Sequence, residues 1–315
     1  AFNMSEIVKK IVIIGTGGTI AGNAASEKEL VNYSAGEKKA AELLLGIPVP
    51  RDIEIETIEL CQIDSKDMTF AILKKMAVIL NDLMLRKDVA GVVITHGTDT
   101  LEETGVFLNC TVVPTKPIVL TASMRPSTAL SADGPLNLLD SIMLASSDYV
   151  GIFALINNTI YLAEEIIKSH TLKVDGFYAG DFGAIGHVYN SKVEFFRNIK
   201  HDEKMNVCLE KLPDDDKDYP WVEIVYSDVS ANGQLISLLV DNGVDGFIIN
   251  GTGNGTVHQN ILNALKSADK TVPTAVTTRV PIGKIMNDQY GLMISPYSHA
   301  AKARMWLTLW LLNSR

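Results

Sequence analysis

Apolar runs rich in β-branched residues alternate with segments of helical period through the first 200 residues. The runs predicted to form strands are residues 7–15, 53–60, 90–97, 116–123 and 150–157. The segments predicted to form helices are residues 36–46, 67–85, 100–110 and 134–147. Several of the strands are apolar at every position, as expected where helices cover both faces of a parallel sheet. The pattern predicts an α/β fold with a mainly parallel sheet flanked by helices, and such sheets bind ligands at the carboxyl ends of their strands.

The composition changes at residues 201–220, a charge-rich stretch with three consecutive aspartates and two prolines. We interpret this stretch as a linker between domains. Beyond it, predicted strands at residues 221–227, 244–256 and 270–278 alternate with predicted helices at residues 231–242 and 256–268. The sequence therefore predicts a larger N-terminal α/β domain over residues 1–200 and a smaller C-terminal α/β domain over residues 221–315.

Composition and charge narrow the class of protein. The chain has 315 residues, 47% of them hydrophobic, with a formal net charge of −9, so a nucleic-acid backbone or an anionic membrane is not the expected partner. No apolar stretch reaches the roughly 18–20 residues that spanning a bilayer requires. Cys61, Cys110 and Cys208 are too few and too scattered for a disulfide framework, and no CxxC pair indicates a metal site. These values are ordinary for a soluble globular enzyme.

The stretch GTGGTIAG at residues 15–22 follows the first predicted strand. It does not match the dinucleotide fingerprint G-x-G-x-x-G, because Ile20 stands where the third glycine belongs, and the chain has no phosphate-loop motif. What remains is a tight glycine turn that presents the hydroxyls of Thr16 and Thr19 at the strand end. The alternative is that Thr19 only caps a turn. The polar residues 20–37, which include Tyr33, form a candidate lid.

A threonine–aspartate pair, Thr98 and Asp99, stands where the predicted strand 90–97 meets the next helix. A helix cap would explain Asp99, because the free N–H groups and the positive dipole end of a helix stabilise negative charge. A helix cap explains Thr98 less well, since one cap needs only one side chain. A hydroxyl beside free N–H groups can instead hold an oxyanion or a substrate carboxylate. Together with the polar loop in residues 120–142, three strand-end loops are predicted to converge on one crevice.

The motifs TGGTIAG, HGTDTLEET and MRPSTALSADGPLNL together resemble those of the bacterial type II L-asparaginases, in the asparaginase/glutaminase family. The resemblance runs through nearly the whole chain and includes GTGNGT at residues 251–256. It implies hydrolysis of the side-chain amide of L-asparagine to L-aspartate and ammonia, with glutaminase as a secondary activity. It also implies a homotetramer, a dimer of dimers, whose active sites join the N-terminal domain of one subunit to the C-terminal domain of its neighbour. The MRPST…SADGP form resembles that of the exported enzymes and implies a periplasmic location, while a cytoplasmic location stays open because no signal peptide is visible.

The resemblance implies specific catalytic residues in the N-terminal domain. Thr19 matches the nucleophilic threonine of the flexible loop, and Tyr33 matches its activating tyrosine. Thr98 and Asp99 match the second threonine and its acid, which also grips the α-amino group of the substrate. Lys168 falls where the family has its buried lysine.

The resemblance also implies residues that bind the substrate. Ser65 matches the serine that binds the α-carboxylate, Ser123 matches a residue whose backbone faces the substrate amide, and Asn254 matches an asparagine from the neighbouring subunit. Lys66 departs from the family, which usually has glutamine or glutamate there. It is either a surface lysine or a cation that helps to hold the α-carboxylate. Residues 279–291 show no equivalent of the cross-subunit glutamate of the family, so the choice between asparagine and glutamine stays open.

The predicted chemistry is amide hydrolysis without a metal or an organic cofactor, and none of the six histidines belongs to a ligand-spaced cluster. A primary amide is a poor electrophile and a threonine hydroxyl a poor nucleophile, so a base and an oxyanion site are needed. In one mechanism Thr19 attacks the amide carbon, and Tyr33 or the Thr98–Lys168 pair accepts its proton. In the other mechanism Thr98 and Lys168 activate a water molecule that attacks directly.

Three other functions stay open on the sequence. They are an ammonia-generating amidohydrolase subunit of a tRNA-dependent amidotransferase, a nucleotide-binding oxidoreductase or sensor, and a catalytically silent amino-acid-binding protein. The incomplete glycine fingerprint argues against the nucleotide-binding function.

Overall fold

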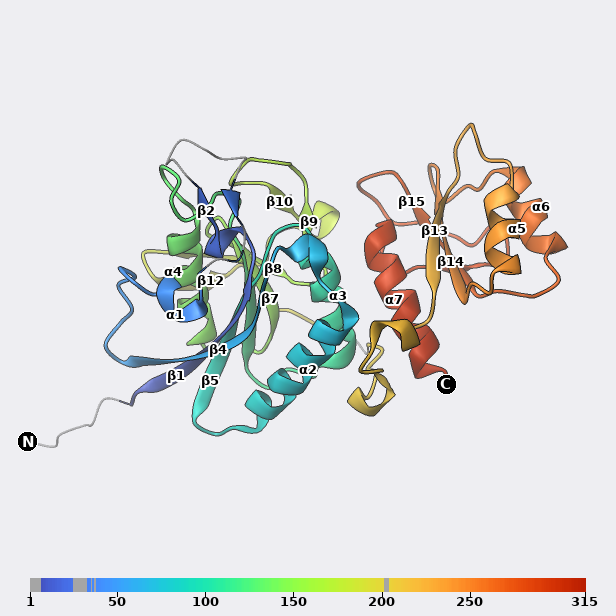
Figure 1. The fold of residues 1–315 in the computed structure, drawn as a ribbon. Helices are drawn as coiled ribbons and strands as arrows, with labels where there is room; N and C mark the ends of the chain where they lie inside the picture. Colours follow the sequence, from blue (N-terminus) through green and yellow to red (C-terminus); the bar gives the residue numbers. More distant parts are fainter. Residues whose placement is uncertain (1–6, 25–32, 35, 37, 201–203) are drawn as a thin grey trace, which may run out of the picture. The chain divides into compact units, whose positions relative to one another are not determined.

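The computed structural model describes residues 7–24, 33–34, 36, 38–200 and 204–315. The chain forms two compact units, Ala1–Lys204 and Met205–Arg315 (Figure 1). Each unit is built on a sheet of its own. Within the described ranges, no helix combines the length and the apolar character that crossing a bilayer requires.

An eight-stranded sheet forms the centre of the first unit, in the order β12-β11-β8-β7-β6-β5-β1-β4. Its strands are β1 (Lys9–Gly17), β4 (Ile53–Ile63), β5 (Val89–Thr95), β6 (Pro117–Thr121), β7 (Gly151–Ile156), β8 (Thr159–Leu162), β11 (Gly186–Tyr189) and β12 (Lys192–Phe195). The five strands from β7 to β4 are parallel, while β8, β11 and β12 add an antiparallel edge. Parallel strands bring their carboxyl ends to one edge of a sheet, so the loops that follow β1, β5 and β6 meet there.

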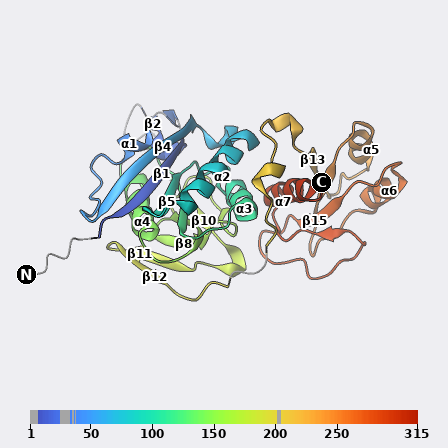
Figure 2. The same ribbon diagram turned by 90° about the horizontal axis from the view of Figure 1, so that it is seen from below.

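Helices cover both faces of this sheet (Figure 2). They are α1 (Ala40–Leu43), α2 (Phe70–Leu85), α3 (Leu101–Thr111) and α4 (Gly134–Ala145). On one face, α1 and α4 share an apolar core with Ile11, Ile13 and Val93. The intervening residues Val12 and Ile14 are also fully buried, and successive side chains of a strand point to opposite faces of the sheet. Burial on both faces explains why these strands are apolar at every position.

Most of the predicted elements of this unit are confirmed, with one clear error. The predicted helix over residues 36–46 is a single turn, α1, because Gly46 (φ +79°) reverses the chain and Pro48 and Pro50 follow. The antiparallel edge strands were not predicted, since runs of four residues carry little periodicity. The remaining short elements are β2 (Asn23–Ala24), β3 (Tyr33–Ser34), β9 (Ile167–Lys168) and β10 (Phe177–Tyr178), with 3₁₀ turns at Thr19–Ala21, Ser65–Asp67 and Gly180–Phe182.

The second unit is built on a parallel four-stranded sheet in the order β13-β14-β15-β16. Its elements are β13 (Val222–Tyr226), α5 (Gln234–Asp241), β14 (Gly246–Gly251), α6 (Gln259–Ser267), β15 (Thr274–Thr278), β16 (Met293–Ile294) and α7 (Ala300–Asn313). Helix α7 packs on one face around Ile248 and Leu307, and α5 and α6 pack on the other around Phe247 and Ile261 (Figure 1). The α/β class predicted for the chain is thereby confirmed, with a larger and a smaller parallel sheet.

The charge-rich stretch between the two sheets contains short helical turns. The boundary between the compact units falls between Lys204 and Met205. The Lys204 ammonium donates to Asn109 Oδ1 at 2.8 Å and pairs with the Glu164 carboxylate, which anchors this end of the first unit. The 3₁₀ turns that follow are Leu209–Lys211 and Asp216–Asp218.

Candidate active site

The turn after β1 and the turn after β5 pack backbone against backbone. Gly17 and Gly18 have φ angles of +101° and +77°, which favour glycine, and they carry the chain into the 3₁₀ turn that begins at Thr19. A Cβ atom on Gly18 would lie 2.6 Å from the nitrogen and from the Cα of Gly97. Only a glycine allows this approach, so the glycines of GTGGTIAG bring the Thr19 turn against the residue that precedes Thr98.

Of the two threonines of the first turn, one is structural. Thr16 is still part of β1, and its hydroxyl donates to the carbonyl oxygen of Thr95 at 2.7 Å. The expectation that both hydroxyls are presented at the strand end is therefore wrong for Thr16, whose bond ties β1 to β5. Thr19 lies on the turn itself and is 7% exposed.

The segment after β4 meets the same turn from another side. Ser65 is buried, and its Oγ accepts a hydrogen bond of 3.1 Å from the backbone N–H of Asp99. The hydroxyl of Thr100 in turn donates to the carbonyl oxygen of Ser65 at 2.7 Å. A Cβ atom on Gly97 would stand only 2.3 Å from Ser65 Oγ. Ser65 therefore lies directly against the Gly97–Asp99 turn, and its hydroxyl proton can donate to an anion placed there.

Lys168 reaches the Thr98–Asp99 pair from 70 residues further along the chain. Its Nζ lies 2.9 Å from Thr98 Oγ1 and 2.7 Å from Asp99 Oδ1. The Lys168 side chain is 20% exposed and that of Asp99 50% exposed, so the pair lies at the edge of solvent. Lys168 is held by β9, which pairs with β10. The structure thus joins a hydroxyl, an ammonium and a carboxylate at one strand end.

These contacts decide between the two interpretations of Asp99. Helix α3 begins at Leu101, its N-cap is Thr100, and no side chain makes a capping hydrogen bond there. The carboxylate of Asp99 binds Lys168 instead. The geometry favours a site over a helix cap.

The loop after β6 completes the group of strand-end loops. Its start is tied to the Thr98 turn, because the N–H of His96 donates to the carbonyl oxygen of Thr121 at 2.8 Å. Ser123 is fully buried, and its hydroxyl donates to the carbonyl oxygen of Arg125 in its own loop. The hydroxyl of Ser123 is therefore engaged within its own loop. The carboxylate of Asp133 accepts the N–H groups of residues 124 and 125 at 2.8 and 3.0 Å, and burial raises its pKa.

The three predicted site residues that remain are Lys66, Tyr33 and Asn254. The Lys66 side chain is 63% exposed and its Nζ lies 2.7 Å from Asp67 Oδ2, an arrangement that favours the surface interpretation. The backbone of Tyr33 pairs with β2, while its side chain falls outside the described part of the chain. Asn254 belongs to the second unit, where its Nδ2 donates to Asn287 Oδ1 at 3.0 Å.

The segment 279–291, singled out for its departure from the family, surrounds Asn254. The Asn254 Oδ1 accepts the N–H of Met286 at 2.9 Å, and its carbonyl oxygen accepts from Gln289 Nε2 at 3.1 Å. The Asp288 carboxylate caps its own turn by accepting the N–H groups of Tyr290 and Gly291. The segment thus holds the side chain and the carbonyl of Asn254 through local hydrogen bonds.

His96 is a contributor that the sequence analysis did not single out. Its ring is fully buried beneath the Gly97–Thr98 turn, where Nδ1–H donates to the carbonyl oxygen of Gly97 at 2.7 Å. Its Nε2 accepts from the hydroxyl of Thr104 at 2.8 Å, since the neutral ring has one donor and one acceptor nitrogen. The signal was present in HGTDTLEET, with a histidine between an apolar strand and a polar turn.

We expect His96 to make the fold sensitive to acid. Burial lowers the pKa of His96 from 6.5 to about 4, so the folded chain stays neutral at this ring while the unfolded chain becomes protonated. The stabilisation is complete above pH 6.5 and is lost as the pH falls toward 4, by on the order of 3 kcal/mol in the free energy of unfolding. Urea unfolding from pH 7 to pH 4 measures it.

The matched variant for this measurement is His96→Gln, which keeps a donor and an acceptor but does not titrate. The difference in free energy of unfolding between the two proteins should narrow as the pH falls. The quantity to compare is the difference in free energy of unfolding between the two proteins, because a second group titrates in the same range. Burial raises the pKa of Asp140 to about 6, so this carboxyl lowers the stability of both proteins as the pH rises. A constant difference across the range would contradict the assignment.

Among the described residues, no group of three or more histidine, cysteine, aspartate or glutamate side chains is arranged to hold a metal ion. Cys61, Cys110 and Cys208 are free thiols. The groups around the three strand-end loops include hydroxyls, backbone amides, the ammonium of Lys168 and the carboxylates of Asp99 and Asp133, which is a set suited to a polar organic ligand.

Comparison with known proteins connects this site to a family. The family model "Asparaginase, N-terminal" matches residues 10–201, and "Glutaminase/Asparaginase C-terminal domain" matches residues 221–315. The glutaminase-asparaginase of Acinetobacter glutaminasificans is 36% identical over 313 residues, which cover 95% of this chain and 94% of that protein. L-asparaginase 2 of Escherichia coli strain K12 is 34% identical over 318 residues, which cover 97% of this chain and 89% of that protein.

A solved structure agrees with these matches. The crystal structure of a probable cytoplasmic L-asparaginase from Campylobacter jejuni superposes with a TM-score of 0.88 at 35% identity, and the match covers 96% of this chain and 95% of that chain. Two family models therefore span both units, and the resemblance to type II enzymes noted in the sequence is confirmed. The chain is an enzyme of the asparaginase family.

Proposed function

We propose that this protein hydrolyses the side-chain amide of L-asparagine to L-aspartate and ammonia, with Thr19 as the nucleophile. The observation that carries the proposal is the contact of Lys168 with Thr98 and Asp99, at 2.9 and 2.7 Å, beside the turn that bears Thr19. Membership of the asparaginase family supports the choice of substrate.

The site selects its substrate by binding the α-carboxylate and the α-ammonium of the amino acid. Ser65 has a hydroxyl proton that can donate to the α-carboxylate, and the half-exposed Asp99 carboxylate can hold the α-ammonium. Asn254, and Lys66 if its side chain leaves Asp67, would add to this binding, with the Asn254 contact coming from a neighbouring subunit. Amides that lack both α-charges should therefore react poorly.

The reaction proceeds in two balanced steps. Thr19 Oγ attacks the side-chain carbonyl carbon, and its proton passes to Tyr33 or through Thr98 to Lys168, where Asp99 stabilises the ammonium that forms. The tetrahedral oxyanion collapses, the C–N bond breaks, and the nitrogen leaves as ammonia after taking back the proton that Tyr33 or Lys168 received from Thr19. Water then attacks the β-acyl ester on Thr19 and releases L-aspartate, which restores the hydroxyl.

The competing mechanism uses the same residues without an acyl enzyme. A water molecule activated by Thr98 and Lys168 attacks the amide carbon directly, and ammonia leaves from the tetrahedral intermediate. Rapid quenching followed by intact-protein mass spectrometry distinguishes the two, because only the first adds an aspartyl group to a threonine.

The proposed function is tested by a coupled assay of ammonia release. We expect saturable release from L-asparagine, slower release from L-glutamine, and negligible release from propionamide, which lacks both α-charges. Stoichiometric L-aspartate should accompany the ammonia. Binding of L-asparagine without any ammonia would instead identify the silent binding protein considered above, and it would overturn the proposal.

The assembly and the location are further parts of the proposal. A homotetramer of two dimers would place Asn254 of one subunit near the Thr19 turn of another. Sedimentation equilibrium should give a molar mass four times that of a single chain. The periplasmic location stays a prediction from the type II form of the motifs.

A further inference from the structure

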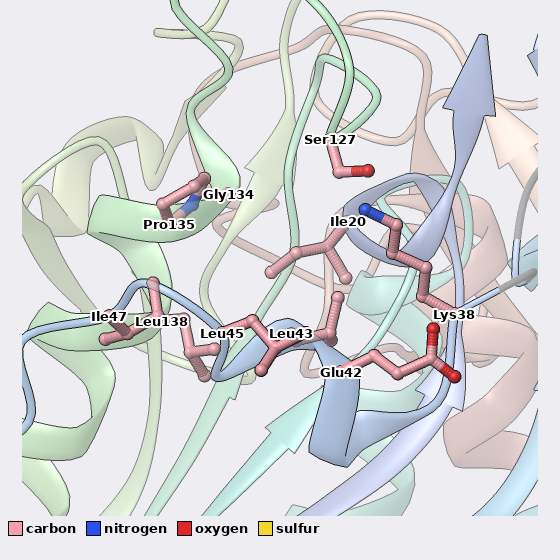
Figure 3. Close-up of a pocket in the computed structure, with 10 residues that line it drawn as sticks. All are labelled: Ile20, Lys38, Glu42, Leu43, Leu45, Ile47, Ser127, Gly134, Pro135 and Leu138. Carbon is pink, nitrogen blue, oxygen red and sulfur yellow. The ribbon is translucent and has the colours of Figure 1, made fainter.

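A cavity in the first unit is lined by Ile20, the residue that follows Thr19 (Figure 3). It is a cavity of about 200 Å³ whose apolar lining includes Ile20, Leu43 and Leu138. Its polar lining consists of Lys38, Glu42 and Ser127. No group of the Lys168–Thr98–Asp99 site lines it, although Ile20 is the residue next to Thr19.

Groups that line the cavity also hold the Thr19 turn. The N–H of Lys38 donates to the carbonyl oxygen of Ala21 at 2.9 Å. The N–H and the hydroxyl of Ser127 both donate to the carbonyl oxygen of Gly22, at 3.0 and 2.8 Å. A ligand in the cavity would thus contact the side chain of Ile20 and two of the residues that fix the end of the turn.

The charges in the lining are not paired with each other. Lys38 is partly buried and Glu42 is exposed, and no ion pair between the side chains of these two described residues is present. In Figure 3 the Lys38 ammonium points toward Ser127, while the Glu42 carboxylate lies at a separate point of the lining. A ligand with one negative and one positive group would satisfy both, whereas a simple carboxylate would meet repulsion from Glu42 and a simple amine repulsion from Lys38.

We propose that this cavity binds a free α-amino acid with a branched apolar side chain, and that occupancy changes the position of the Thr19 turn. A cavity of about 200 Å³ has room for a ligand of amino-acid size. The carboxylate would bind Lys38 and Ser127, the ammonium would bind Glu42, and the side chain would cover Ile20, Leu43 and Leu138. The binding itself does not depend on turnover at the proposed active site.

Isothermal titration calorimetry with L-leucine tests the binding on the full chain. Saturable binding is expected in the parent protein, and isocaproate and isoamylamine, which each carry one of the two charges, should bind at least about tenfold more weakly. Lys38→Met and Glu42→Gln should each weaken L-leucine binding by about tenfold or more. Lys39→Met is the matched control, because Lys39 is exposed and does not line the cavity, and it should bind like the parent.

Two outcomes of the titration overturn the proposal. One is the absence of saturable binding of L-leucine to the parent protein. The other is binding that Lys38→Met and Glu42→Gln leave unchanged, because the ligand would then occupy another place. Circular dichroism of both variants shows whether they are folded, and neither changes a residue of the core.

Kinetics with L-asparagine test the coupling to the turn. L-leucine should change kcat by at least about twofold in the parent and in Lys39→Met, and it should leave Lys38→Met unchanged. A purely competitive effect, with kcat constant and only KM altered, would place L-leucine in the active site and overturn the proposal. If the protein shows no asparaginase activity at all, the proposed function fails, while calorimetry still decides whether the cavity binds the amino acid.

Discussion

Replacing Thr19 by alanine is expected to lower kcat/KM for L-asparagine by about a thousandfold or more. The variant loses the hydroxyl that attacks the amide carbon, and neither the base nor the oxyanion site can replace a missing nucleophile. The fold should be retained, because removing a hydroxyl and a methyl group from a turn leaves the sheet intact. The measurement is the coupled ammonia assay, together with urea unfolding to confirm stability.

Thr19→Ser is the matched control, because it restores the hydroxyl and omits only the methyl group. Its kcat/KM for L-asparagine should be at least about a hundredfold higher than that of Thr19→Ala. Trapped aspartyl ester should be found in the parent and be absent from Thr19→Ala. Activity of Thr19→Ala within about tenfold of the parent would remove Thr19 as the nucleophile and favour direct attack by water.

Replacing Lys168 by methionine is expected to lower kcat by about 10²- to 10⁴-fold. Lys168 Nζ contacts both Thr98 Oγ1 and Asp99 Oδ1, so the variant loses the group that accepts the proton as a neutral amine, and the Asp99 carboxylate loses this partner. Methionine has a similar length and fills the same space, which limits the structural effect. Steady-state kinetics with L-asparagine over a range of pH provide the measurement.

The pH profile separates a base from a residue that only positions its neighbours. If Lys168 accepts a proton, the acidic limb of the kcat/KM profile, along which activity rises with pH as the base loses its proton, should change shape in the variant as well as fall. Lys173→Met is the control, because Lys173 is an exposed lysine five positions further along the same connection, and its activity should equal that of the parent. A fall in activity with an unchanged profile would refute the role of Lys168 as the base.

The site residues differ in how far they could be predicted. The motif HGTDTLEET marked Thr98 and Asp99, but it left a helix cap and a ligand site as alternatives. The structure favours the site, because Asp99 binds Lys168 and α3 has no side-chain cap. His96 was missed, since its place in HGTDTLEET between an apolar strand and a polar turn does not by itself show that the ring is buried. The direction of the Thr16 side chain was predicted wrongly for the same reason: the sequence does not show that its hydroxyl points into the sheet.

The helices and strands also differ in how well they could be predicted from the sequence. Strands such as β1 and β5 were predicted well, because burial on both faces leaves a continuous apolar run. Helix α1 was overestimated, since the helical period of residues 36–46 outweighed Gly46 and the prolines that follow. The antiparallel edge of the large sheet escaped prediction, because its short strands take their pairing from neighbours distant in the chain.

By itself, the amino-acid sequence determined the α/β class, the mainly parallel sheet of the larger unit and the membership in the asparaginase family, because these depend on local hydrophobic period and on motifs written contiguously in the chain. Only the tertiary structure decided which polar side chains touch. Lys168 meets Thr98 across 70 positions, and Ser65 meets Asp99 across 34, through hydrogen bonds that no local pattern encodes. The Ser65–Asp99 contact follows from how parallel strands bring their carboxyl ends to one edge, and Lys168 arrives from the separate β9–β10 pair, so both contacts exist only once the chain has folded.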